Sequence, residues 1–206
     1  VIQVSSSAGG TGVSTLAAGL AWAAARSGIK VGLVELDPSV GGIDLLLGIE
    51  RKDGWRWPEL ASARGVTTDL GSHLPSLDGV EVVSAGRVGV DVPPAARRAV
   101  VNSLAGDHEL VVVDPGGLDA PEVTVDVKVG VVAADLRSVM TARGRDLPNL
   151  LVARRGPGRS MLDGDVESVL GVRPDLVIKD DRRLARGHGD GEAPWVVASR
   201  RWRRGC

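Results

Sequence analysis

The stretch SSSAGGTGVST, residues Ser5–Thr15, combines closely spaced glycines with a terminal Ser-Thr pair. This combination is typical of a loop that binds phosphate, because glycines let backbone N–H groups turn inward around an anion and a hydroxyl binds Mg²⁺. A lysine normally adds positive charge, and this stretch has none. The pattern G-x-x-x-x-G-K-[ST] fails at Ser7, which replaces the first glycine, and at Val13, which replaces the lysine.

The candidate ligands of a nucleotide in this stretch are consecutive in the sequence. They are Gly9, Gly10, Thr11, Gly12, Val13, Ser14 and Thr15. The glycines are expected to form the anion-binding backbone, Ser14 to bind the metal and Thr15 to contact a phosphate. On its own, the pattern fits a tight strand-to-helix turn without a ligand about as well as it fits an anion site.

Acidic residues end two other apolar segments. VGLVELD places Glu35 and Asp37 at the end of one predicted strand, and VVVDPGG places Asp114 at the end of another. Because the carboxyl ends of parallel strands meet at one edge of a sheet, we expect Ser14, Asp37 and Asp114 to converge on a hydrated Mg²⁺. The alternative is that each carboxylate only caps a loop or helix, which fits one acid alone better than three features in this order.

Alternating strands and helices must position these residues. The strand at 1–4, the helix at 14–26 and the strand at 31–35 form a βαβ unit, which implies parallel pairing and a right-handed crossover. Further strands are predicted at 80–83, 110–113, 127–133, 150–153 and 176–178, and further helices at 43–50, 94–104, 136–143, 165–170 and 182–186. Residues 51–78 are expected to be irregular. The pattern predicts a three-layer α/β/α fold with a mostly parallel, doubly wound sheet.

Composition limits the class of protein. The 206 residues carry a net charge of −1, which argues against nucleic acid as a partner. We expect one domain over 1–194 and a short basic tail or helix over 195–206. The single cysteine, Cys206, allows no disulfide within the chain, which fits the cytoplasm. No apolar run is long enough to span a membrane. The strand-like start predicts no signal peptide and is compatible with a domain cut from a longer protein.

Longer stretches resemble a known family. AGGTGVSTLAAGLAWAAARSGIKVGLVELDPSVGGIDLLLG is similar to the deviant phosphate-loop ATPases of the MinD/ParA group, which carry a K-G-G-x-G-K-[ST]-T loop, a D-x-D motif and a third motif of four apolar residues followed by Asp. GWRWPELASARG, LVARRGPG and DLVIKDDRRLARGHGDGEAP resemble the actinobacterial CpaE-like, or septum site-determining, proteins. The resemblance covers nearly the whole chain. It implies a P-loop NTPase fold with ATP or ADP and Mg²⁺ as cofactors.

The resemblance also assigns roles to single positions. The family lysine that reaches across a dimer falls on Ala8, and the ordinary loop lysine falls on Val13, so both charges are lost. The D-x-D motif falls on Glu35 and Asp37, which makes Asp37 the one catalytic candidate, as a residue that positions water. The third-motif Asp falls on Asp114.

The position that reads adenine also departs from the family. Its Asn falls near Ala153, which brings Arg154 in as a candidate nucleotide ligand. An exposed turn is the more ordinary role for Arg154 and its neighbour Arg155.

Loss of the lysines predicts a pseudo-ATPase. A charge-assisted hydrogen bond contributes roughly 1.5–3 kcal/mol, so binding weakens by roughly ten- to a hundredfold and can survive. Hydrolysis suffers more, because phosphoryl transfer needs positive charge at the γ-phosphate. The resemblance then implies a regulator of the division site or of secretion and pilus machinery, which docks to protein partners as a homodimer or with another ATPase. The alternatives are a slow authentic ATPase that cycles between monomer and dimer, and a ParA-like DNA binder.

The last residues, APWVVASRRWRRGC, place Trp195, Ala198 and Trp202 at helical spacing beside arginines. This pattern favours either peripheral contact with the inner face of a membrane or a helix packed on the body.

His73, His108 and His188 lack the spacing of metal ligands and are expected to be structural or at the surface. Trp55 and Trp57 are expected to anchor the irregular segment.

Overall fold

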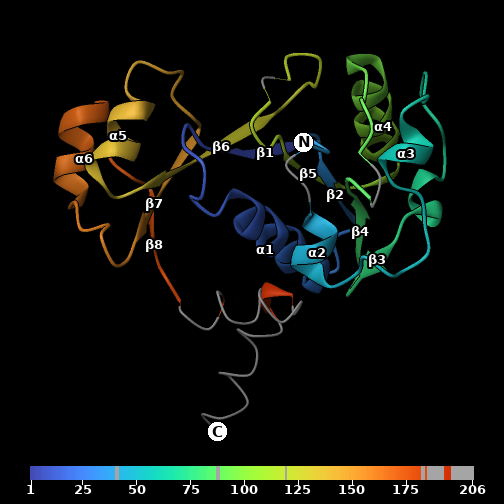
Figure 1. The fold of residues 1–206 in the computed structure, drawn as a ribbon, viewed down its shortest axis with the longest axis horizontal. Helices are drawn as coiled ribbons and strands as arrows, with labels where there is room; N and C mark the ends of the chain where they lie inside the picture. The colour runs from blue at the N-terminus through green and yellow to red at the C-terminus, as the bar shows by residue number, and fades with distance from the viewer. Residues whose placement is uncertain (40–41, 87–88, 119, 182–183, 185–192, 196–206) are drawn as a thin grey trace, which may run out of the picture.

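An eight-stranded sheet forms the middle of the molecule in the computed structural model, which describes residues 1–39, 42–86, 89–118, 120–181, 184 and 193–195 (Figure 1). In spatial order its strands are β3 (Ser76–Leu77), β4 (Val80–Val83), β2 (Val31–Glu35), β5 (Leu110–Asp114), β1 (Ile2–Ser5), β6 (Val127–Ala133), β7 (Leu150–Arg155) and β8 (Leu176–Lys179). Every neighbouring pair is parallel except β3 and β4. This confirms the predicted α/β fold with a mostly parallel sheet.

Helices cover both faces of the sheet. They are α1 (Val13–Arg26), α2 (Ile43–Leu47), α3 (Trp57–Leu60), the 3-10 helix η1 (Leu70–His73), α4 (Pro94–Asp107), α5 (Leu136–Ala142) and α6 (Asp163–Leu170). Figure 1 shows α1 and α2 on one side of the sheet and α4 on the other. The buried side chains divide in the same way, because neighbouring strand residues point to opposite faces: Leu33 packs with α1 and Val34 with α4.

The same alternation continues along β7. Val152 belongs to the core under α1, whereas Leu151 and Ala153 belong to the core under α5 and α6. The two residues that follow, Arg154 and Arg155, therefore lie on opposite faces of the sheet. This placement decides which of the two can meet the Gly-rich loop.

The segment 51–78 is more ordered than the sequence indicated. It contains α3, η1 and the antiparallel strand β3, so the prediction of an irregular segment was wrong in part. Trp57 is fully buried and its indole N–H donates to the backbone carbonyl of Glu35, as expected for an anchor. The elements here are two to four residues long, too short to show a period in the sequence.

One described residue of the predicted tail packs on the body. The Trp195 ring stacks on Trp22 of α1 with centroids 5.7 Å apart, and its Nε1 donates to Asp78 Oδ2 at 2.7 Å. Ala198 and Trp202 lie outside the described residues, as do His188 and nearly all of the predicted helix at 182–186.

None of the helices among the described residues is both long enough and apolar enough to cross a membrane.

Candidate functional site

The Gly-rich stretch forms a turn between β1 and α1. Gly10 and Gly12 adopt left-handed backbone conformations, with φ of 73° and 92°, which residues with a Cβ rarely adopt. Gly12 is the N-cap of α1, and the first helical hydrogen bond runs from Leu16 N to Gly12 O at 2.9 Å. The Thr11 hydroxyl donates to Ala8 O at 3.3 Å, so the loop is closed by its own contacts.

The start of α1 is open to an anion. No side chain caps Gly12, and the first turn carries no acidic residue. The first N–H groups of a helix lack partners within the helix and carry the positive end of its dipole, so they favour a bound anion. Val13 is partly buried and packs against the core under α1, where it supplies volume but no charge.

Asp37 and Asp114 lie together at the carboxyl edge of the sheet. Glu35 and Asp114 are register partners, and Leu36 N donates to Asp114 O at 2.8 Å. Gly116 turns back so closely that a Cβ there would lie 2.7 Å from the Asp37 Cβ. Asp114 Oδ1 accepts the Gly116 N–H at 2.9 Å.

Both carboxylates are buried, and each has part of its hydrogen-bonding capacity in use. Asp37 Oδ1 accepts from the backbone N–H and the hydroxyl of Ser39. The described residues contain no group of three His, Cys, Asp or Glu side chains that could hold a metal. Ser14 lies in the first turn of α1. Its hydroxyl and the two carboxylates are oxygen donors of the kind that Mg²⁺ binds, and Mg²⁺ takes few protein ligands and keeps several waters.

Glu35 has a structural role that the sequence did not reveal. One carboxylate oxygen accepts from Gly42 N at 3.1 Å and the other from Ala85 N at 3.0 Å, which links the ends of β2, α2 and β4. Burial raises the pKa of Glu35 to about 7, and the carboxylates of Asp114 and Asp44 also raise it, whereas the backbone N–H groups of Ala85 and Ile43 lower it. The side chain at the first position of the D-x-D motif therefore holds neighbouring segments together through their backbone N–H groups.

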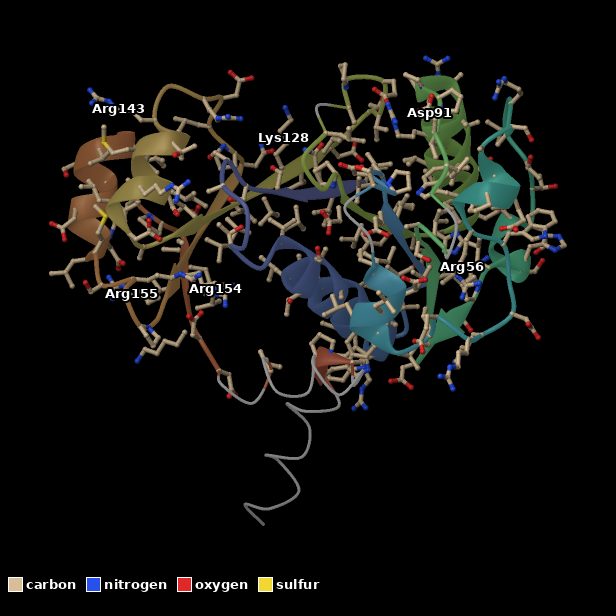
Figure 2. All side chains as sticks on the ribbon, in the orientation of Figure 1. Arg56, Asp91, Lys128, Arg143, Arg154 and Arg155 are labelled. Carbon is tan, nitrogen blue, oxygen red and sulfur yellow. The ribbon has the colours of Figure 1, made fainter. Side chains whose placement is uncertain are left out.

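Arg154 reaches the loop from β7. Its Nη1 donates to Gly10 O at 3.4 Å and lies 2.7 Å from the point where a Cβ on Gly12 would stand. Its Nε donates to Asp180 Oδ1. The neighbouring Arg155 binds Asp163 Oδ1 of α6 at 2.7 Å, on the other face of the sheet. Both arginines are strand residues in ion pairs, so the expected exposed turn was wrong (Figure 2).

Asp180 is a further acidic residue of the site that the sequence analysis did not select, although a signal was available. It directly follows β8, so it stands at the same edge of the sheet as Asp37 and Asp114. A position just past the carboxyl end of a parallel strand is the signal that selected those two acids, and Asp180 has it as well.

Comparisons with known proteins find relatives over most of the chain. No protein-family model matches the chain. An uncharacterised protein of Mycobacterium tuberculosis is 35% identical over 202 residues, which cover 90% of this chain and 56% of the relative. A putative septum site-determining protein MinD of Mesostigma viride is 27% identical over 211 residues, covering 90% of this chain and 65% of the relative. The chain thus spans little more than half the length of its mycobacterial relative.

Solved structures share the fold. A ParA family ATPase from Chlorobium tepidum superposes with a TM-score of 0.82 at 17% identity, covering 96% of this chain and 92% of that one. MinD in the MinC:MinD complex of Aquifex aeolicus gives 0.74 at 19% identity, with coverage of 97% and 88%. MinD of Pyrococcus horikoshii, solved with Mg-ADP, gives 0.72 at 22% identity, with coverage of 95% and 87%.

The chain belongs to the MinD/ParA superfamily. Within this MinD/ParA domain, the loop keeps its glycines and its helix but lacks the lysines that the family resemblance places at Ala8 and Val13. The basic side chain that contacts the loop among the described residues, Arg154, comes from a different strand. The glycines that shape the loop and the basic side chain that contacts it therefore come from different parts of the chain.

Proposed function

We propose that this chain binds ATP or ADP with Mg²⁺ at the Gly9–Thr15 loop, hydrolyses it slowly or not at all, and acts as a CpaE-like regulator. The supporting observation is the loop itself. Gly10 and Gly12 hold left-handed conformations at an uncapped helix start, while Val13 packs into the core. Left-handed glycines alone also suit a turn without a ligand, but a helix start with no side-chain cap and no acidic residue in its first turn favours a bound anion as well.

The residues divide the task by chemistry. The N–H groups of the loop and of the first turn of α1 hold the phosphates, and Thr15 adds a hydroxyl. Ser14, Asp37 and Asp114 provide oxygen ligands for Mg²⁺, which neutralises phosphate charge when bound. Asp37 is the candidate for positioning a water. Hydrolysis stays slow because neither Ala8 nor Val13 places a positive charge at the γ-phosphate.

The proposed cellular role is to position the division septum or the secretion and pilus machinery. It is supported by relatives that bear the name MinD and by the solved complex of MinC with MinD. The protein would act through nucleotide-dependent docking to protein partners, as a homodimer or with a second ATPase. It would work in the cytoplasm, with peripheral contact at the inner face of the membrane through the basic tail.

Calorimetric titration with Mg-ATP, followed by a phosphate-release assay on the same sample, tests the proposal. We expect binding without release. The variant V13K serves as the gain-of-charge control and should bind about tenfold or more tightly. Absence of binding in both the wild type and V13K would contradict the proposal and assign function to the protein's surfaces alone.

A slow authentic ATPase is the second candidate, and one observation favours it. Arg154 touches the loop, so positive charge is present near the site even though the loop carries none. Steady phosphate release by the wild type that stops in the variant D37N would establish this alternative.

A further inference from the structure

Arg154 is placed against the turn of the loop that precedes α1. Its Nη1 contacts Gly10 O, and the room it occupies is the room that a side chain at position 12 would need. Glycine at position 12 therefore serves two purposes, a left-handed backbone and space for the guanidinium. The loop and Arg154 fit each other as one unit, although 142 positions separate Gly12 from Arg154 in the sequence.

A second strand orients this arginine. Asp180, after β8, binds Arg154 Nε through Oδ1 and Arg159 Nη1 through Oδ2, the latter at 2.9 Å. Two guanidinium groups share one carboxylate, so the cluster keeps one net positive charge beside the loop. The three side chains are between 18% and 27% exposed, so solvent screens that charge only in part.

We propose that Arg154 supplies the positive charge that the loop has lost, and that Asp180 is its positioning residue. The inference rests on the proposed function, because it takes the ligand to be the polyphosphate of a nucleotide. A guanidinium has a planar fork of donors, so Arg154 holds Asp180 and Gly10 O together and still presents its charge to an anion on the loop. Position 13 can then be an apolar core residue.

The matched control lies next to it on the same strand. Arg155 has nearly the same exposure, 28% against 27%, and also binds one carboxylate, but on the face toward α6. The variant R155M removes the same charge from the same strand without touching the loop. Comparison of R154M with R155M therefore separates an effect at the loop from a general loss of charge.

The experiment measures dissociation constants of Mg-ATP and of magnesium pyrophosphate by calorimetry, with the melting temperature of each variant. We expect R154M to weaken both ligands about tenfold or more and R155M to leave both unchanged. R154K should recover part of the affinity, because lysine restores the charge but cannot hold Asp180 and Gly10 O at the same time. If R154M does not fold, R154Q replaces it.

Asp180 is tested by the sign of its effect. The variant D180N raises the positive charge beside the loop, so charge alone predicts tighter binding. A positioning role predicts weaker binding, since the amide has one acceptor oxygen for two guanidinium groups and no charge to hold Arg154 in place. We expect weaker binding, and tighter binding would overturn the positioning role.

The remaining outcomes separate the two proposals. If the wild type binds both ligands and R154M binds them with the same affinity, the inference is overturned and the proposed function still stands. R154K as weak as R154M, with both melting below the wild type, would overturn the charge role and identify a structural brace. No binding by the wild type would overturn the inference together with nucleotide binding.

Discussion

Alanine substitutions at three loop glycines should separate backbone strain from contact with Arg154. Gly9 has no left-handed φ, and a Cβ added there would meet no atom within 4 Å. Gly10 has φ of 73° and the same open surroundings. Gly12 has φ of 92° and would place its Cβ 2.7 Å from Arg154 Nη1. The Gly9 substitution thus adds neither effect, the Gly10 substitution adds backbone strain, and the Gly12 substitution adds backbone strain together with a steric conflict.

The expected changes in the free energy of unfolding follow from these differences. G9A should be neutral or stabilising by up to about 1 kcal/mol, because alanine restricts the unfolded chain. A left-handed alanine costs roughly 1–2 kcal/mol, so G10A should lose about 1 kcal/mol after that gain. G12A should lose about 1 kcal/mol more, because Arg154 must leave Gly10 O and this partly exposed contact has modest strength.

Urea unfolding followed by circular dichroism measures the series, and calorimetry with Mg-ATP measures its effect on binding. The decisive control is G12A in an R154A background, where the extra cost over G10A should disappear. If that extra cost persists without Arg154, or if G12A is as mild as G9A, then contact with Arg154 does not set the requirement for glycine at position 12.

Three further outcomes are expected. Because the folded-state pKa of Glu35 is raised from 4.5 to about 7, its contribution to stability is fully present below pH 4.5 and falls by about 3 kcal/mol as pH rises to 7; urea titrations of E35Q should lack this slope. W195A should lose roughly 3–5 kcal/mol, because Trp195 is buried and its ring stacks on Trp22, whereas W55A, at a residue that is 40% exposed, should lose about 1 kcal/mol or less in the same assay. D114N should weaken Mg-ATP binding while leaving binding of metal-free ATP unchanged, as measured by calorimetry with and without Mg²⁺.

Much of the fold could be predicted from sequence because its strands are buried on both faces. The segment VGLVE is apolar except at its last residue and is bounded by Lys30 and by Asp37-Pro38, so β2 was predicted with its observed bounds. By contrast, α3 begins with Trp57 and Pro58 and ends within one turn. The signals for this helix were a proline in its first turn and Glu59, whose carboxylate accepts the Arg56 N–H. Neither signal gives the repeating pattern of apolar residues by which a longer helix is recognised.

The site was predictable as a set of positions but not as a set of contacts. Strand ends selected Asp37 and Asp114, which the structure brings together. The same rule selected Glu35 as part of the motif, yet its carboxylate binds backbone N–H groups of Gly42 and Ala85. The position of a residue after a predicted strand shows which edge of the sheet it occupies. The tertiary packing decides whether its oxygen atoms face solvent or accept hydrogen bonds from backbone N–H groups.

A phosphate loop needs shape and charge, and in the function proposed for this chain the two come from different elements. Shape comes from left-handed glycines and an uncapped helix start, which depend on backbone alone and persist when the lysines at positions 8 and 13 are absent. Charge is a property of side chains, so it can come from any strand whose end reaches the loop, as β7 does. Ground-state binding tolerates such a substitution, because backbone N–H groups and the helix dipole already favour an anion. Catalysis tolerates it less, because charge must stand at the γ-phosphate in the transition state. A domain that holds nucleotide without hydrolysing it therefore needs the loop backbone and a nearby positive charge, but it does not need a positive charge at the γ-phosphate.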